Sequence, residues 1–232
     1  MLKQSAAKNT LIFVGADKGG VGKTMLARLL LDYLGGVSVR AFDTEPIGAG
    51  VLKRFYPSAK QVNLTQSQDQ ALIVDGLGAA RVTLVDIAAG LLSPTLHLFQ
   101  RIGFKQGVDA HLCVMHVLGN TVASLGEIKN TTALIAGNGG DHVLVKNHAA
   151  GSGFFEWDAG TAKELAPYTP ERLIGIGHLD VQAAERVDKS NQMFSAFVSD
   201  AANSRLMRGL VRAWQAEAVA EFARIGLINL VS

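Results

Sequence analysis

The heptad KGGVGKT at residues 18–24 constrains this chain more than any other feature of its sequence. An apolar, β-branched run at residues 10–15 comes directly before it. Residues 24–34 follow with apolar side chains at helical spacing, and the pair Gly35-Gly36 then ends the pattern. We therefore expect the heptad to form a tight turn between a strand and a helix, because its glycines permit backbone conformations that other residues avoid.

The rest of the chain alternates short apolar runs with helical stretches. Strands are expected at residues 10–15, 37–42, 82–86, 110–117, 142–146 and 173–176. Helices are expected near residues 24–34, 47–55, 67–76, 93–103, 120–135, 180–198 and 203–225. Strands that are apolar on both faces and separated by helices predict an α/β fold, with a mostly parallel central sheet covered by helices on both faces.

A single domain is expected over residues 1–232, since the chain has no internal repeat, low-complexity tract or obvious linker. Its longest irregular stretch, residues 147–161, fits either a lid or an ordinary surface loop. We expect neither a secretory signal nor a membrane-spanning segment, because no apolar run is placed or sized for one. The sequence thus predicts a cytoplasmic protein.

Composition excludes several classes of protein. With 48% apolar and 18% charged residues, the chain is typical of a folded protein with a large core and not of a disordered one. Lys and Arg total 22 and Asp and Glu total 20, so a formal charge of +2 excludes a polybasic or strongly acidic chain. Cys113 is the single cysteine, which rules out an internal disulfide framework, a thiolate zinc site or a Cys-ligated iron–sulfur cluster within one chain.

A glycine-rich turn followed by a helix N-terminus is suited to binding phosphate. Successive backbone N–H groups can surround the anion, and the helix dipole favours negative charge there. In such a loop Lys23 would reach the β- and γ-phosphates, and the Thr24 hydroxyl would coordinate Mg²⁺. The alternative is a glycine-rich turn without a ligand, but the register of both Lys23 and Thr24 with the glycines favours the phosphate loop.

The loop departs from the ordinary motif at its start, where Asp17 takes the place of the first glycine and Lys18 is an added lysine. This pattern resembles the deviant Walker A family of P-loop NTPases, which contains the ParA plasmid-partition ATPases, the MinD division-site ATPases and nitrogenase iron protein. The resemblance implies ATP and Mg²⁺ as cofactors. It also implies an ATP-dependent homodimer, in which Lys18 reaches the nucleotide of the second subunit.

The resemblance further implies which residues bind the nucleotide. These are Lys18, Gly19, Gly20, Val21, Gly22, Lys23, Thr24, Met25 and Asn147. Members of the family usually carry a second Ser or Thr where this chain has Met25, so one hydroxyl contact to the α-phosphate is missing. Asn147 follows the strand at 142–146 and corresponds to an asparagine that reads the adenine edge in the family; a turn-capping asparagine is the equal alternative.

Three carboxylates follow expected strands. Asp43 and Glu45 stand where the family has Asp-x-Asp-Pro, with Glu45 replacing an aspartate that positions the attacking water. A carboxylate at the end of a parallel strand faces the ligand crevice, which favours a functional role for Asp43. The alternative is that Asp43 or Thr44 caps a helix near residues 47–55, and for Glu45 the functional and structural interpretations are about equal. Asp86 ends the strand at 82–86 and resembles the Mg²⁺-binding acid of the family, with Gly90 approaching the γ-phosphate. The implied catalytic residues are Lys18, Lys23, Asp43 and Glu45, and the implied metal ligands are Thr24, Asp43 and Asp86.

Arg205, Arg208 and Arg212 are spaced by three and four residues, which places them on one helix face. A ParA-like dimer binds non-specific DNA, and two such faces would contact phosphates; a solvated helix face is the alternative. A membrane anchor of the MinD kind is less favoured, because the apolar end at residues 221–232 carries one basic residue and is interrupted by Gly226.

The resemblance implies a Mg²⁺-dependent ATPase that acts as a dimerisation switch in DNA segregation, positioning or transfer. Its nearest relatives would be the plasmid-partition and conjugation-associated ParA-type ATPases, with a ParB-like activator protein as a partner. An ATP-dependent biosynthetic ligase of the same fold is one alternative. A nucleotide-binding regulatory module with little turnover is another, because of Met25 and Glu45.

Overall fold

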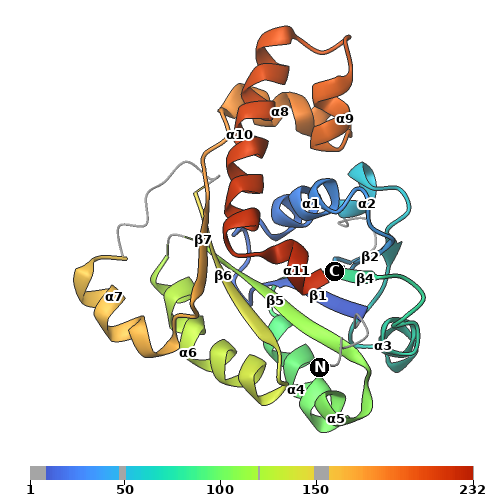
Figure 1. Ribbon diagram of the computed structural model, residues 1–232, viewed down its shortest axis with the longest axis vertical. Coiled ribbons are helices and arrows are strands. Elements are labelled where there is room, and N and C mark those ends of the chain that lie inside the picture. The colour runs from blue at the N-terminus through green and yellow to red at the C-terminus, as the bar shows by residue number, and fades with distance from the viewer. Residues whose placement is uncertain (1–8, 47–50, 120, 149–156, 232) are drawn as a thin grey trace, which may run out of the picture.

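A computed structural model describes residues 9–46, 51–119, 121–148 and 157–231. These residues form a seven-stranded sheet, in the order β3-β2-β4-β1-β5-β6-β7, in which every neighbouring pair is parallel (Figure 1). The strands are β1 (Asn9–Gly15), β2 (Val39–Asp43), β3 (Lys60–Gln61), β4 (Val82–Asp86), β5 (Ala110–Leu118), β6 (Asp141–Asn147) and β7 (Arg172–Ile176). The predicted α/β class is confirmed, and only the two-residue edge strand β3 was not expected.

Helices connect the strands and cover the sheet. They are α1 (Lys23–Tyr33), α2 (Leu52–Phe55), α3 (Ser67–Val74), α4 (Leu92–Arg101), α5 (Phe104–Gly107), α6 (Val122–Gly137), α7 (Ala159–Leu165), α8 (Val181–Ser190), α9 (Phe194–Ser199), α10 (Arg205–Arg224) and α11 (Leu227–Val231). A 3₁₀ turn (Ala166–Tyr168) follows α7. Most of the irregular stretch predicted at 147–161 lies outside the described residues, and α7 begins within its last part.

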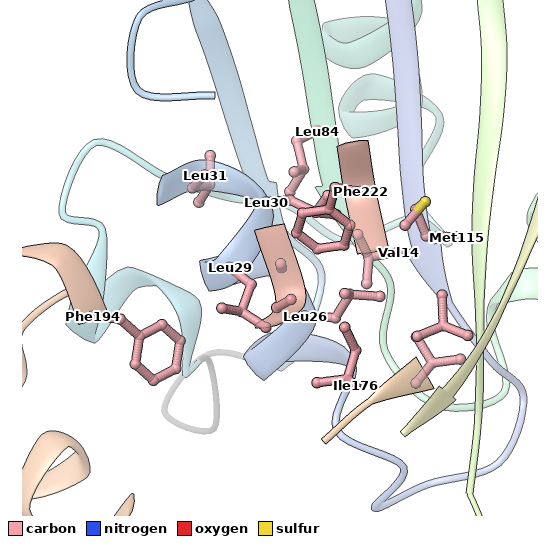
Figure 2. Close-up of a cluster of buried hydrophobic side chains, with 14 of the residues drawn as sticks. Val14, Leu26, Leu29, Leu30, Leu31, Leu84, Met115, Ile176, Phe194 and Phe222 are labelled. Atoms are coloured by element: carbon pink, nitrogen blue, oxygen red, sulfur yellow. The ribbon is translucent and has the colours of Figure 1, made fainter. Parts of the chain in front are cut away.

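Each face of the sheet packs against its own set of helices, because successive side chains of a strand point to opposite sides. Ile12 and Val14 of β1 pack with α1, α10 and α11 in one core cluster (Figure 2). Leu11 and Phe13 of the same strand pack with α3, α4, α5 and α6 in a second cluster. The alternation explains why the strands are apolar throughout, as expected for a sheet buried on both faces.

The helices α8 and α9 and the first turns of α10 form a lobe beyond the end of the sheet (Figure 1). The single helix predicted at 180–198 is wrong, because Asn191 adopts a left-handed conformation with φ 53° and separates α8 from α9. Arg28 of α1 anchors this helical lobe: its guanidinium lies 3.4 Å from the ring centre of Phe55 and 4.1 Å from that of Phe194.

The C-terminal segment packs on the domain, as its apolar sequence predicts. Phe222 of α10 and Leu227 of α11 are fully buried, and the Phe222 ring meets Tyr33 of α1 edge to face at 5.3 Å. Within the described ranges, no helix combines the length and the apolar character that crossing a membrane requires.

Two histidines stack inside the sheet, one on β5 and one on β6. The ring centres of His116 and His142 are 5.5 Å apart with an interplanar angle of 22°, and His116 is fully buried. Burial, together with the nearby His116, lowers the pKa of His142 to about 3. His116 therefore belongs to the core, and His142 packs against it.

The half-buried imidazole of His142 makes stability depend on pH. Because its pKa lies below that of an unfolded histidine, the unfolded chain takes up the proton first. The contribution to stability is therefore complete above about pH 6.5 and is lost as pH falls toward 3. We expect the parent to lose about 3 kcal/mol more than His142→Gln in unfolding free energy between about pH 7 and 4, measured by urea denaturation. The control His97→Gln, at an exposed position of α4, should match the parent; parallel profiles for parent and His142→Gln would contradict the prediction.

Candidate functional site

The heptad forms the turn between β1 and α1, at the carboxyl edge of the central strands. Gly20 and Gly22 have φ of 73° and 88°, in the left-handed region that other residues rarely adopt. Gly22 is also the N-cap of α1 and provides no side-chain hydrogen bond to the first turn. The N–H groups at the start of α1 are thus left for an anion, as a phosphate loop requires.

Lys23 lies across its own loop. It is 7% exposed, and its Nζ donates to the carbonyl oxygen of Lys18 at 3.4 Å. Lys18 itself is exposed on the outer rim of the loop, beside the exposed Gly19 and Gly20. The two lysines therefore occupy different environments: Lys23 is held over the turn, whereas Lys18 faces outward.

Asn147 contacts the loop directly. Its Nδ2 donates to the Val21 carbonyl oxygen at 2.7 Å, and a Cβ built on Gly22 would overlap that same nitrogen. Asn147 is 7% exposed, so its amide is committed to the loop backbone in this structure. This contact is not the local turn cap that the alternative interpretation of Asn147 expects, because Val21 lies 126 residues away in the glycine-rich turn. Recognition of adenine by Asn147 stays a prediction. Met25, predicted to touch nucleotide, packs against the core cluster of the α1 face.

Two of the predicted carboxylates are neighbours at this edge. Asp43 and Asp86 are paired in the register of β2 and β4, and Asp86 is also paired with Val14 of β1. Sheet register therefore brings both acids beside the phosphate loop, as parallel strands require. The arginines at 205, 208 and 212 lie elsewhere, on α10.

Asp86 is a buried carboxylate whose charge is incompletely compensated. It is 2% exposed, and among the described residues neither of its oxygens has a hydrogen-bond partner within normal distance. Burial raises the pKa of Asp86 to about 7; the nearby Thr24 hydroxyl and Lys23 ammonium oppose this shift, whereas Asp43 and Glu45 add to it. A buried anion with free lone pairs beside a threonine hydroxyl is suited to a cation such as Mg²⁺.

Both carboxylate oxygens of Asp43 accept hydrogen bonds from backbone N–H groups. Its Oδ1 accepts from the Glu45 N–H and its Oδ2 from the Leu52 N–H, both at 3.0 Å, and the residue is fully buried. The bond to Leu52 lies at the start of α2, so the capping interpretation of Asp43 is supported. Its role as a metal ligand stays a prediction.

Glu45 borders a cavity of about 640 Å³ next to the loop after β4. The cavity is lined by Thr44, Glu45, Pro46, Gln61, Val62, Asn63, Thr65, Asp69, Ala88, Ala89 and Leu91. Sequence reasoning missed this cavity and also missed Thr44, whose buried hydroxyl oxygen accepts from the Ala88 N–H at 2.7 Å. The two residues are 44 positions apart, so no local pattern signals the contact.

The three arginines share one surface of α10, as predicted. Arg205, Arg208 and Arg212 line a hollow of about 330 Å³ together with Gly209. The opposite face of α10 is buried through Val211, Trp214, Ala218 and Phe222. Within the described residues, no three His, Cys, Asp or Glu side chains form a cluster that could hold a metal without further ligands.

Comparison with known proteins identifies the fold. No protein family matches the sequence, and no curated protein matches it by sequence. Among solved structures, a protein of Borrelia burgdorferi B31 assigned to plasmid partition and bound to AMPPNP aligns with a TM-score of 0.52 at 12% identity, covering 94% of this chain and 99% of its own.

Two further structures align less well. A second Borrelia burgdorferi plasmid partition protein gives a TM-score of 0.46 at 13% identity, over 79% of this chain and 95% of its own. The ATP complex of a single-residue variant of Cyanothece McdA gives 0.49 at 11% identity, over 92% and 97%. Only the first alignment has a TM-score above 0.5, and it shows that this chain shares the fold of the Borrelia plasmid partition protein.

The contact between Asn147 and the loop can be tested by one isosteric change. Asn147→Asp replaces the donor that faces the Val21 carbonyl with an oxygen, so two acceptors meet at a buried position. We expect a loss of about 1–3 kcal/mol in unfolding free energy at neutral pH. Asn63→Asp is the matched control, because the exposed Asn63 Oδ1 only accepts, from Thr65. Equal stability of the two variants would show that the Asn147 bond contributes nothing.

Proposed function

We propose that this protein is a Mg²⁺-dependent ATPase that acts as an ATP-driven dimerisation switch, in the manner of ParA-type proteins. The main support is the site beside β1: an uncapped α1 N-terminus, a lysine held over the loop, and the unpaired buried carboxylate of Asp86. The resemblance of the heptad and the fold of the Borrelia protein agree with this proposal. The proposed setting is the cytoplasm, in DNA segregation, positioning or transfer.

In this proposal, different residues at the loop bind the phosphates of ATP and the Mg²⁺ ion. The N–H groups of Gly19 to Thr24 surround the phosphates, and Lys23 moves from the Lys18 carbonyl to the β- and γ-phosphates. Thr24 and Asp86 would hold Mg²⁺, directly and through water, with Asp43 beside them. When bound, Mg²⁺ supplies positive charge that offsets the phosphate oxygens and the buried Asp86.

Hydrolysis then depends on the residues around the loop. Glu45 would orient the attacking water, since its half-buried carboxylate belongs to the segment that borders the site. Lys18 has a different role. Exposed on the rim, it is free to reach the nucleotide of a second subunit and to offset charge that develops there, which would link dimerisation to ATP.

The two lysines provide the test. Lys23→Ala should abolish ATP binding in calorimetry, because it removes the charge on the phosphates. Lys18→Ala should still bind one ATP per chain but should neither dimerise nor hydrolyse it; dimerisation is followed by light scattering with ATP and with ADP. A parent that stays monomeric with ATP, together with normal hydrolysis by Lys18→Ala, would overturn the switch.

We also propose that the α10 hollow binds DNA without sequence preference, with a ParB-like protein as activator. Three arginines on one face can contact the phosphates of a duplex, and a dimer would present two such faces. The buried opposite face of α10 keeps the arginines oriented outward.

Changing Arg205, Arg208 and Arg212 together to Ala should weaken DNA binding and flatten its dependence on salt, because fewer counterions are released. Filter binding across a salt series with ATP present measures both effects. Replacing Lys163, Lys189 and Lys60 together is the control, since it removes the same charge from other elements. If the arginine variant retains DNA as well as the parent does, these arginines form an ordinary solvated helix face and do not bind DNA.

The cavity beside Glu45 favours a second candidate, an ATP-dependent ligase with an amine substrate. Its volume of about 640 Å³ suits a small molecule. Glu45 and Asp69 supply carboxylates, and the described lining contains no lysine or arginine. An ammonium group would therefore be favoured close to the phosphate loop.

The ligase hypothesis predicts turnover that depends on an amine. If it holds, 1,4-diaminobutane supplied together with bicarbonate as the carboxyl reactant should stimulate phosphate release from ATP, and the uncharged 1,4-butanediol with the same bicarbonate should not. Asp69→Asn should reduce this stimulation, since it keeps an acceptor for the Asn63 N–H but removes the charge. Asp75→Asn, an exposed change at the end of the same helix, should have no effect. Turnover that is indifferent to the diamine rules against this substrate class.

A further inference from the structure

Asp17 connects the phosphate loop to the segment after β4. Its carbonyl oxygen accepts from the Gly90 N–H at 2.9 Å. Its Oδ1 accepts from the Ser93 N–H at 3.1 Å, and its Oδ2 accepts from the Ser93 hydroxyl. On the other side, the Asp17 N–H donates to Oε2 of Glu127 on α6 at 2.9 Å. One residue therefore joins the loop, residues 87–93 (the switch segment) and α6.

The carboxylate of Asp17 stabilises the start of α4 from outside that helix. Ser93 lies in the first turn of α4, where backbone N–H groups have no partner within the helix. The residue at the N-cap position is Leu91, whose side chain cannot accept a hydrogen bond. Asp17 thus takes the place of a local cap, and its negative charge is favourable at a helix N-terminus.

The hydrogen bond from the Gly90 N–H to the Asp17 carbonyl oxygen limits what else the Gly90 amide can bind. A backbone N–H donates one strong hydrogen bond, and that of Gly90 is directed to Asp17. Gly90 is exposed and has a φ of 78°, in the left-handed region that glycine adopts readily. An amide that is engaged in this way is unavailable to any other acceptor until the bond to Asp17 breaks.

We propose that Asp17 is a positioning residue that holds the switch segment in a resting arrangement, and that a terminal phosphate competes with Asp17 for the Gly90 amide. This inference rests on the proposed nucleotide function. The bonds from Asp17 to Gly90 and Ser93 (the Asp17 latch) then set how readily the protein responds to ATP, and ADP is indifferent to them because it lacks that phosphate.

Weakening the Asp17 latch should change nucleotide affinity differently from damaging the phosphate loop. If only a fraction of molecules has a released switch segment, the apparent affinity for a triphosphate is reduced by that fraction. Weakening the latch raises the fraction and should tighten binding of a triphosphate while leaving ADP unchanged. A distorted phosphate loop would instead weaken both nucleotides together.

The first experiment compares affinities for AMPPNP and ADP by calorimetry in the parent, Asp17→Asn and Ser93→Ala. We expect both variants to bind AMPPNP about three- to tenfold more tightly and ADP within about twofold of the parent. The matched controls are Asp158→Asn, which alters an aspartate that caps α7, and Ser67→Ala at the exposed start of α3. Both controls should resemble the parent.

The second experiment needs no nucleotide. Amide hydrogen exchange over residues 90–94 should be faster in Asp17→Ala and Ser93→Ala than in the parent and the controls. Asp17→Ala removes both carboxylate bonds to α4, and Ser93→Ala removes the one from the Ser93 hydroxyl. Unchanged exchange, or AMPPNP and ADP affinities that fall together, would overturn the latch. A parent that binds neither nucleotide overturns the proposed function instead, and the exchange result then decides whether Asp17 holds the segment.

Discussion

The left-handed backbone of the turn between β1 and α1 is the constraint on which the candidate site depends. Gly22 must be glycine for two reasons, its positive φ and the space taken by Asn147. Because the turn is this tight, α1 begins directly at the sheet edge with its N–H groups uncovered. The same geometry brings Lys23 back over the loop and leaves Lys18 on the rim.

The turn is held in place by polar side chains from several elements. Asn147 reaches it from β6, and Glu127 reaches it from α6. A further contact, from the Thr44 hydroxyl oxygen to the Ala88 N–H, ties the end of β2 to the segment after β4. These bonds pre-organise the backbone before any ligand arrives. Asp86 is the contrast: buried at the centre of these contacts, its carboxylate is left with free lone pairs.

The helix α1 links this site to the helical lobe. Its first residue is Lys23, and five residues later Arg28 packs between Phe55 and Phe194. Burial lowers the pKa of Arg28 only to about 10, so the guanidinium remains charged at neutral pH and its cation–π contacts persist. Helix α9 in turn packs against both α1 and α10. The helix α1 therefore begins at the turn after β1 and also contacts the helical lobe.

The sequence by itself determined the parallel sheet, the glycine-rich turn between β1 and α1 and the shared face of the three arginines, since each follows from local periodicity or spacing. The prediction missed the break between α8 and α9, where Asn191 adopts a left-handed conformation within the polar run at residues 188–192. Tertiary structure alone decided the partners of Asp17, Asn147 and Thr44. Each of them contacts a residue at least 44 positions away, and such pairs form only when sheet order and register bring distant strand ends to one edge.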